Sequence, residues 1–128
     1  MHVESVRFLI VGVLFLGPTI HRFNKKCLVA VSLVAERAGC EWISGDAGRL
    51  WARDDAGSRV IAAMVEGEGN GGSGWLSVLV AGEGPEVCRG IVSELRHELV
   101  VQGMRLGVVE VKGGTHPPTL ADLLSLPS

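Results

Sequence analysis

The strongest structural signal in this chain comes from residues 74–103, GWLSVLVAGEGPEVCRGIVSELRHELVVQG. Within residues 75–81 the side chains alternate between a fully apolar face and a mixed, uncharged face, which is typical of an interior β-strand. Gly82 and Gly84 allow a sharp turn, and Pro85 has the fixed φ that is favoured at the first position of a helix. We therefore predict a strand, a tight turn and a helix in that order.

The predicted helix has one apolar stripe, because its apolar residues recur every three or four positions. The stripe consists of Cys88, Ile91, Val92, Leu95 and Leu99. Gly103 follows the last turn and suits the left-handed conformation that commonly ends a helix. We expect this central amphipathic helix to pack its stripe on a sheet.

Two apolar segments precede this unit. Residues 8–16, FLIVGVLFL, are about half the length of a membrane span, and three interpretations are open: a buried helix, a buried strand or a signal-like segment. Over residues 3–16 we expect a helix that ends at Gly17 and Pro18. Residues 27–36, CLVAVSLVAE, are expected to form a strand that is apolar on both faces.

Further strands are expected over residues 41–44, 49–53, 59–66 and 105–111. Short turns between successive strands favour antiparallel neighbours. The predicted fold is therefore of the α+β class, with an antiparallel β-meander of about five to six strands covered by an N-terminal helix and the central helix. The glycine-rich residues 67–74, GEGNGGSG, are expected to form a mobile hairpin tip.

The length of 128 residues favours a single domain. We divide it into an N-terminal apolar helix and linker (1–26), a sheet with its helix (27–111) and a tail (112–128). In the tail, Thr119 can cap a short helix over residues 119–126, which offers leucines for docking.

Composition excludes several classes of function. The net charge is −2 and no basic run exceeds Lys25-Lys26, so nothing resembles a nucleic-acid footprint. The three cysteines lack CxxC spacing, which favours reduced thiols in a cytoplasmic protein. The four histidines lack the spacing of metal ligands, and no nucleophile motif occurs, so we expect no enzyme activity, no cofactor and no metal.

Two candidate sites follow from the pattern. Arg49, Trp51 and Arg53 share one side of a predicted strand, and exposed aromatic and arginine residues are typical anchors of protein interfaces. As an alternative, the backbone N–H groups around Gly82, Glu83 and Gly84 could bind an anion or small ligand at the helix start, together with the glycine-rich hairpin tip. The helix start lacks the lysine and the Ser/Thr of a phosphate-binding loop.

From residue 27 onward the chain resembles the C-terminal half of the COR domain of Roco proteins. The segments that carry the resemblance are LVAVSLVAERAG, GRLWARDD, GWLSVLVAGEGP, IVSELRHEL and VVQGMRLGVVEV, preceded by VRFLIVGVLFL. The resemblance covers residues 6–111 and implies a regulatory and dimerisation module without catalytic residues. The GxxxxGKS or GxxxxGKT motif of the neighbouring GTPase domain is absent from this sequence.

The expected function is therefore a non-catalytic protein-interaction or dimerisation module of a signalling or regulatory protein. Its partner would be another protein or a second copy of the chain, with no nucleic acid and no membrane span. The alternative is a small-ligand or anion-binding domain that uses the glycine-rich turns.

Overall fold

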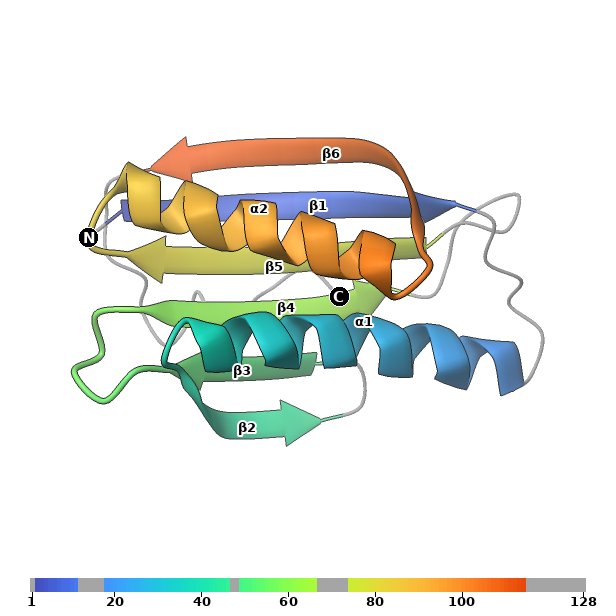
Figure 1. Ribbon diagram of the computed structural model, residues 1–128, viewed down its shortest axis with the longest axis horizontal. Coiled ribbons are helices and arrows are strands. Elements are labelled where there is room, and N and C mark those ends of the chain that lie inside the picture. Colours follow the sequence, from blue (N-terminus) through green and yellow to red (C-terminus); the bar gives the residue numbers. More distant parts are fainter. Residues whose placement is uncertain (1, 12–17, 47–48, 67–73, 115–128) are drawn as a thin grey trace.

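The computed structural model describes residues 2–11, 18–46, 49–66 and 74–114 (Figure 1). These residues form six strands and two helices. In chain order they are β1 (His2–Val11), α1 (Pro18–Arg37), β2 (Glu41–Asp46), β3 (Arg49–Arg53), β4 (Val60–Glu66), β5 (Gly74–Gly82), α2 (Pro85–Val101) and β6 (Arg105–Gly114).

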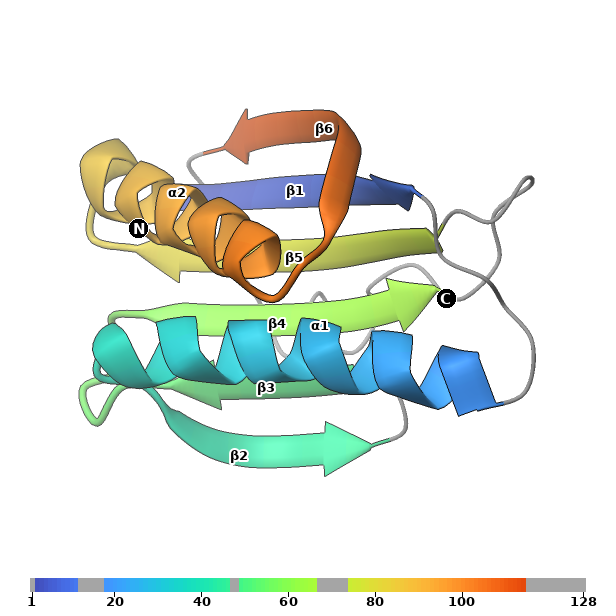
Figure 2. The same cartoon turned by 45° about the vertical axis from the view of Figure 1, so that its right-hand side comes forward.

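The six strands form one antiparallel sheet with the order β2-β3-β4-β5-β1-β6. Strands β2 to β5 follow one another as a meander, while β1 and β6 come from opposite ends of the described chain and complete the other half. Both helices lie side by side on the same face of the sheet (Figures 1 and 2). The predicted α+β class, an antiparallel sheet covered by two helices, is confirmed.

The main core lies between this face and the two helices. Its largest fully buried side chains come from β1, β4, β5 and α2, and α1 adds two valines: Phe8, Ile10, Ile61, Leu76, Leu95, Leu99, Val31 and Val34. The core therefore packs the layer of two helices against the central strands of the sheet.

The predicted helix over residues 3–16 was wrong for residues 3–11, because residues 2–11 form strand β1. Residues 12–16 of this prediction lie outside the described residues. Val6, Phe8 and Ile10 are buried in the core, and the residues between them point to the other face. This period of two is that of a strand. The apolar run over residues 8–11 concealed this period, because its side chains are apolar on both faces of the strand.

The predicted strand over residues 27–36 was also wrong, because these residues form the second half of α1. The buried positions follow helical spacing: Cys27, Ala30, Val31, Val34 and Ala35. The helix begins at Pro18, so it also contains residues that we had assigned to a linker. The boundary drawn at residue 26 therefore falls inside α1.

The central strand–turn–helix unit is confirmed. Pro85 is the first residue of α2, and Gly103 has a φ of 87° just after its end. The N–H of Gly103 donates to the carbonyl of Val100 at 2.9 Å, and the N–H of Met104 donates to the carbonyl of Leu99 at 3.0 Å. These two bonds form a Schellman motif, which turns the chain from α2 into β6.

Two expectations fall outside the described residues. They are the mobile hairpin tip predicted over residues 67–74, of which only Gly74, the first residue of β5, is described, and the helix over residues 119–126.

Candidate functional site

The face of the sheet opposite the helices, here called the second face, carries its own apolar cluster. This second-face cluster consists of Val60, Ala62, Leu79 and Ala81, with Val3 and Trp51 packed against them. Four neighbouring strands contribute: β3, β4, β5 and β1. Cross-strand pairing places the members in two rows, Trp51–Ala62–Leu79 and Val60–Ala81–Val3.

The cluster is well shielded from solvent. Ala62 and Ala81 are 0% exposed, and Leu79 is 8% exposed. Neither helix contributes a residue to the cluster, because α1 and α2 pack on the opposite face. A sheet that is apolar on both faces needs a layer on each, and among the described residues only one face has a helical layer.

Polar groups adjoin the cluster on the second face. The guanidinium of Arg7 lies over the ring of Trp75, 4.2 Å from its centroid, and this is a favourable cation–π arrangement. Ser77 is only 3% exposed, and its hydroxyl has no hydrogen-bond partner among the described residues. A buried hydroxyl without a partner is costly, so a partner group at this point would be favoured.

Of the predicted interaction residues, Trp51 lies on this face of β3. Trp51 is half-buried against the second-face cluster, whereas we had expected it on a solvent-facing surface. Arg53 is exposed, and the backbone of Arg49 pairs with Met64 of β4. The structure thus brings the indole of Trp51 into an apolar group that the sequence pattern had not indicated.

The turn before α2, at Gly82, Glu83 and Gly84, contains a carboxylate of its own, that of Glu83. The side chain of Arg59 donates from Nε to the Glu83 carboxylate, at 3.2 Å and 3.4 Å. A hydrogen bond from its own backbone N–H and the contact with Arg59 lower the pKa of Glu83. Gly84 caps α2 in an extended conformation without a side-chain hydrogen bond. An external anion would meet this carboxylate.

Arg59 also connects three loops at this end of the sheet. Its Nη1 donates to the carbonyl of Ala38, just after α1, at 3.2 Å. Its backbone N–H donates to Asp54 at 3.0 Å, and the hydroxyl of Ser58 donates to the same carboxylate. Burial raises the pKa of Asp54, but these hydrogen bonds outweigh that effect and lower it. The network has a structural role.

The cysteines are placed as buried apolar side chains. Burial raises the pKa of Cys27 to about 12, and its thiol contacts the sulfur of Met104 at 3.8 Å. Burial is also the main cause that raises the pKa of Cys40 and of Cys88. None of these thiols is an activated nucleophile. In the described ranges, no group of three or more His, Cys, Asp or Glu residues could hold a metal ion.

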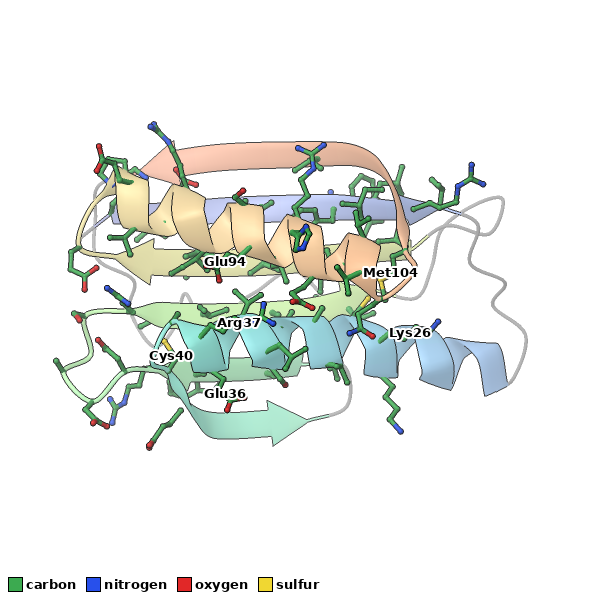
Figure 3. All side chains as sticks on the ribbon, viewed as in Figure 1. Lys26, Glu36, Arg37, Cys40, Glu94 and Met104 are labelled. Carbon is green, nitrogen blue, oxygen red and sulfur yellow. The ribbon has the colours of Figure 1, made fainter. Side chains whose placement is uncertain are left out.

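The sequence interpretation missed two buried carboxylates. Glu98 of α2 is 5% exposed and accepts a hydrogen bond from Arg37 Nη1 at 2.6 Å, and Figure 3 shows Arg37 pointing from α1 toward α2. Glu4 of β1 is 4% exposed and lies 3.2 Å from His2 Nε2. A signal existed for Glu98, since it lies seven residues after Ile91 and so on the buried stripe.

Comparison with known proteins gives no relative from which to carry over a function. No family model matches the chain, and no curated protein matches it. No helix within the described residues is long and apolar enough to cross a membrane.

Proposed function

We propose that this protein is a non-catalytic protein-interaction module that binds a protein partner or a second copy of itself through the second face of its sheet. The observation that supports the proposal is the second-face cluster, which is apolar and lies on the face opposite the two described helices, α1 and α2. Apolar area in a contiguous patch is the main source of association free energy. The half-buried indole of Trp51, at the margin of this cluster, is a suitable aromatic anchor.

The edges of the sheet are less suited to binding. The register shifts between Trp42 and Ser44 where edge strand β2 pairs with β3. A second shift occurs between Phe8 and Ile10, where β1 pairs with the other edge strand, β6. Such irregularities disfavour the addition of a further strand at an edge. They favour the second face over the edges as the binding surface.

The proposal rests on this face and not on the resemblance to COR domains. One of the segments that carry the resemblance, LVAVSLVAERAG, resembles a strand of that family but lies largely in α1 here. The role in a signalling or regulatory protein of the cytoplasm belongs to the same proposal. The small-ligand alternative has no comparable support, because the Glu83 carboxylate and Arg59 already pair at the helix start.

The test is the molar mass of the full chain in solution, measured by light scattering after size exclusion across a dilution series. We compare the wild type with Trp51→Ser, on the second face, and with Val101→Ser, which is 60% exposed on α2. Both variants lose an apolar side chain. We expect the wild type to form a dimer. Trp51→Ser should raise the dissociation constant of this dimer about tenfold or more, and Val101→Ser should leave it unchanged.

A monomer at every concentration would remove self-association. If both variants weaken the dimer equally, the interface does not lie on the second face.

A further inference from the structure

Ser77 is an unsatisfied polar group of the second face. It lies in the middle of β5 between Leu76 and Val78, whose side chains belong to the main core. Its own side chain therefore points to the second face. The residue is only 3% exposed, and its hydroxyl has no hydrogen-bond partner among the described residues. A hydroxyl buried in this way has lost its bonds to water without replacing them.

Larger side chains surround this hydroxyl on the second face. Trp75 and Leu79 lie two residues away on either side along β5. Cross-strand pairing places Met64 of β4 on one side of Ser77 and Arg7 of β1 on the other. The serine side chain is shorter than all of these neighbours. A group that satisfies the hydroxyl must therefore approach from outside the sheet, between them.

Arg7 makes the surroundings of Ser77 cationic. It pairs with Ser77 across β1 and β5, and its guanidinium lies over the indole of Trp75, 4.2 Å from the ring centroid. This contact holds the positive charge over β5, two residues from Ser77. A guanidinium has several N–H donors, so the contacts of Arg7 within its own chain and a contact with a partner can coexist.

We infer that the second face recognises an acidic side chain, Asp or Glu, of its protein partner. The carboxylate accepts hydrogen bonds from the Ser77 hydroxyl and the Arg7 guanidinium, while apolar side chains of the partner cover the second-face cluster. This inference rests on the proposed function and specifies the partner for which the second face is suited. A carboxylate is an acceptor only, and it can satisfy a hydroxyl and a guanidinium together.

Other partner chemistry fits this point of the sheet less well. An ammonium group would meet the like charge of Arg7. A purely apolar partner would leave the Ser77 hydroxyl buried without a bond, which lowers affinity. The polar requirement therefore adds specificity to an apolar surface that would otherwise accept many apolar partners.

Ser77→Ala distinguishes this role from a structural one in the free chain. Removing an unsatisfied buried hydroxyl should raise the melting temperature, because alanine has no polar group to desolvate. The matched control is Ser5→Ala on β1. Ser5 is exposed on the same face, so this variant should change the melting temperature little. A lower melting temperature in Ser77→Ala would overturn the inference, since the hydroxyl would then have a partner within the chain.

The binding test uses isovalerate and isovaleramide as probes of the full chain. The two molecules share a branched apolar part, and near neutral pH only isovalerate is charged. Chemical shifts of the Ala62 methyl, the Ser77 amide and the Trp75 indole report binding in nuclear magnetic resonance titrations. We expect isovalerate to bind the wild type about tenfold more tightly than isovaleramide, because hydrogen bonds to a charged group are the stronger ones.

The titrations use a protein concentration at which light scattering gives the monomer, or Trp51→Ser as the background where the wild-type dimer persists. Ser77→Ala should reduce the preference for isovalerate to about twofold or less, and Ser5→Ala should keep it. If Ser77→Ala keeps the full preference, the carboxylate is not recognised through Ser77 and the inference is overturned.

The outcome is separable from that for the proposed function. If both probes bind the wild type equally, or if neither binds, the carboxylate site is overturned, while light scattering still decides whether the second face associates. A preference for isovalerate in a protein that is monomeric at every concentration would support the carboxylate site while removing self-association.

Discussion

At the scale of single residues, the helix layer is held together by a charged pair as well as by apolar contacts. Glu98 is almost fully buried in α2, and Arg37 of α1 supplies its cation from a half-exposed position. A buried carboxylate is stable only when it is paired and hydrogen-bonded. The pair therefore fixes how the two helices lie beside each other, while contributing less net stability than its 2.6 Å distance suggests.

Arg37→Ala should destabilise the protein by about 1–2 kcal/mol, because it leaves the Glu98 carboxylate buried without its partner. The value is below the 3–5 kcal/mol typical of fully buried pairs, since Arg37 is about half exposed. Urea unfolding measures the free energy of unfolding. Arg96→Ala, at an exposed position of α2, should change it by less than about 0.5 kcal/mol. Equal losses in both variants would contradict the role of the pair.

The buried thiols should make stability fall in alkaline solution. The pKa of Cys27 is about 12 in the folded protein, against 9.0 in an exposed thiol. Above about pH 9 the unfolded chain loses this proton while the folded chain keeps it. The free energy of unfolding should then fall by up to about 1.4 kcal/mol per pH unit from this one group.

Urea unfolding between about pH 8 and about pH 10 gives this slope. Cys27→Ala should have a lower free energy of unfolding at about pH 8, because it removes a buried side chain. Its free energy of unfolding should also fall less steeply as the pH rises. If the variant keeps the wild-type slope, another group is responsible for the alkaline loss.

At the scale of elements, the β5–α2 unit could be predicted from sequence because its determinants are local. The alternation in β5, Pro85 at the helix start and Gly103 after its end act within a few residues of one another. For β1 and the second half of α1, the choice between strand and helix does not depend on local sequence. Both are apolar runs, and tertiary packing determines whether the buried positions follow a period of two or of 3.6.

The second-face cluster was beyond sequence analysis for a related reason. The Trp51 side chain alternates with apolar neighbours between two arginines, so its strand face looked solvated. Its true surroundings come from cross-strand pairing with Ala62 and, beyond it, Leu79. Pairing partners far apart in the chain cannot be read from local spacing.

The turn between β5 and α2 offers a test at the element scale. Gly84→Ser should stabilise the protein by a few tenths to about 1 kcal/mol, because a hydroxyl would supply the side-chain cap that α2 lacks. The backbone there is extended, and a Cβ would meet nothing within 4 Å. Gly82→Ser should destabilise it by about 1–2 kcal/mol, because its Cβ would lie 3.1 Å from Val87.

Thermal unfolding of the two serine variants decides the point. The same substitution two residues apart should move the melting temperature in opposite directions. A shift of the same sign in both would mean that the close approach at Gly82 or the missing cap at Gly84 does not govern this turn.

At the scale of the whole molecule, the central strands are apolar on both faces, and this shapes what the protein can do. The first face is closed by two helices, whose contact with the sheet forms the main core. The second face carries the second-face cluster, which is shielded from solvent although neither α1 nor α2 packs on it. Under the proposed function, the covering of this apolar face by a partner is itself the binding event.

Association through the second face also predicts that thermal stability depends on protein concentration. A partner that binds only the folded chain stabilises it by mass action, so the melting temperature of a dimer rises as the chain becomes more concentrated. For the wild type we expect the melting temperature to rise when the protein concentration increases about a hundredfold. Trp51→Ser should reduce this rise, because it removes the aromatic anchor of the cluster.

Val101→Ser should keep the wild-type rise, since Val101 is exposed on the helix side of the molecule. Differential scanning fluorimetry or calorimetry at several concentrations gives the comparison. The concentration dependence of the melting temperature is the quantity to compare. The absolute melting temperature is not suitable, because Trp51→Ser also loses packing within one chain. Parallel rises in all three proteins would place any dimer contact elsewhere than on the second face.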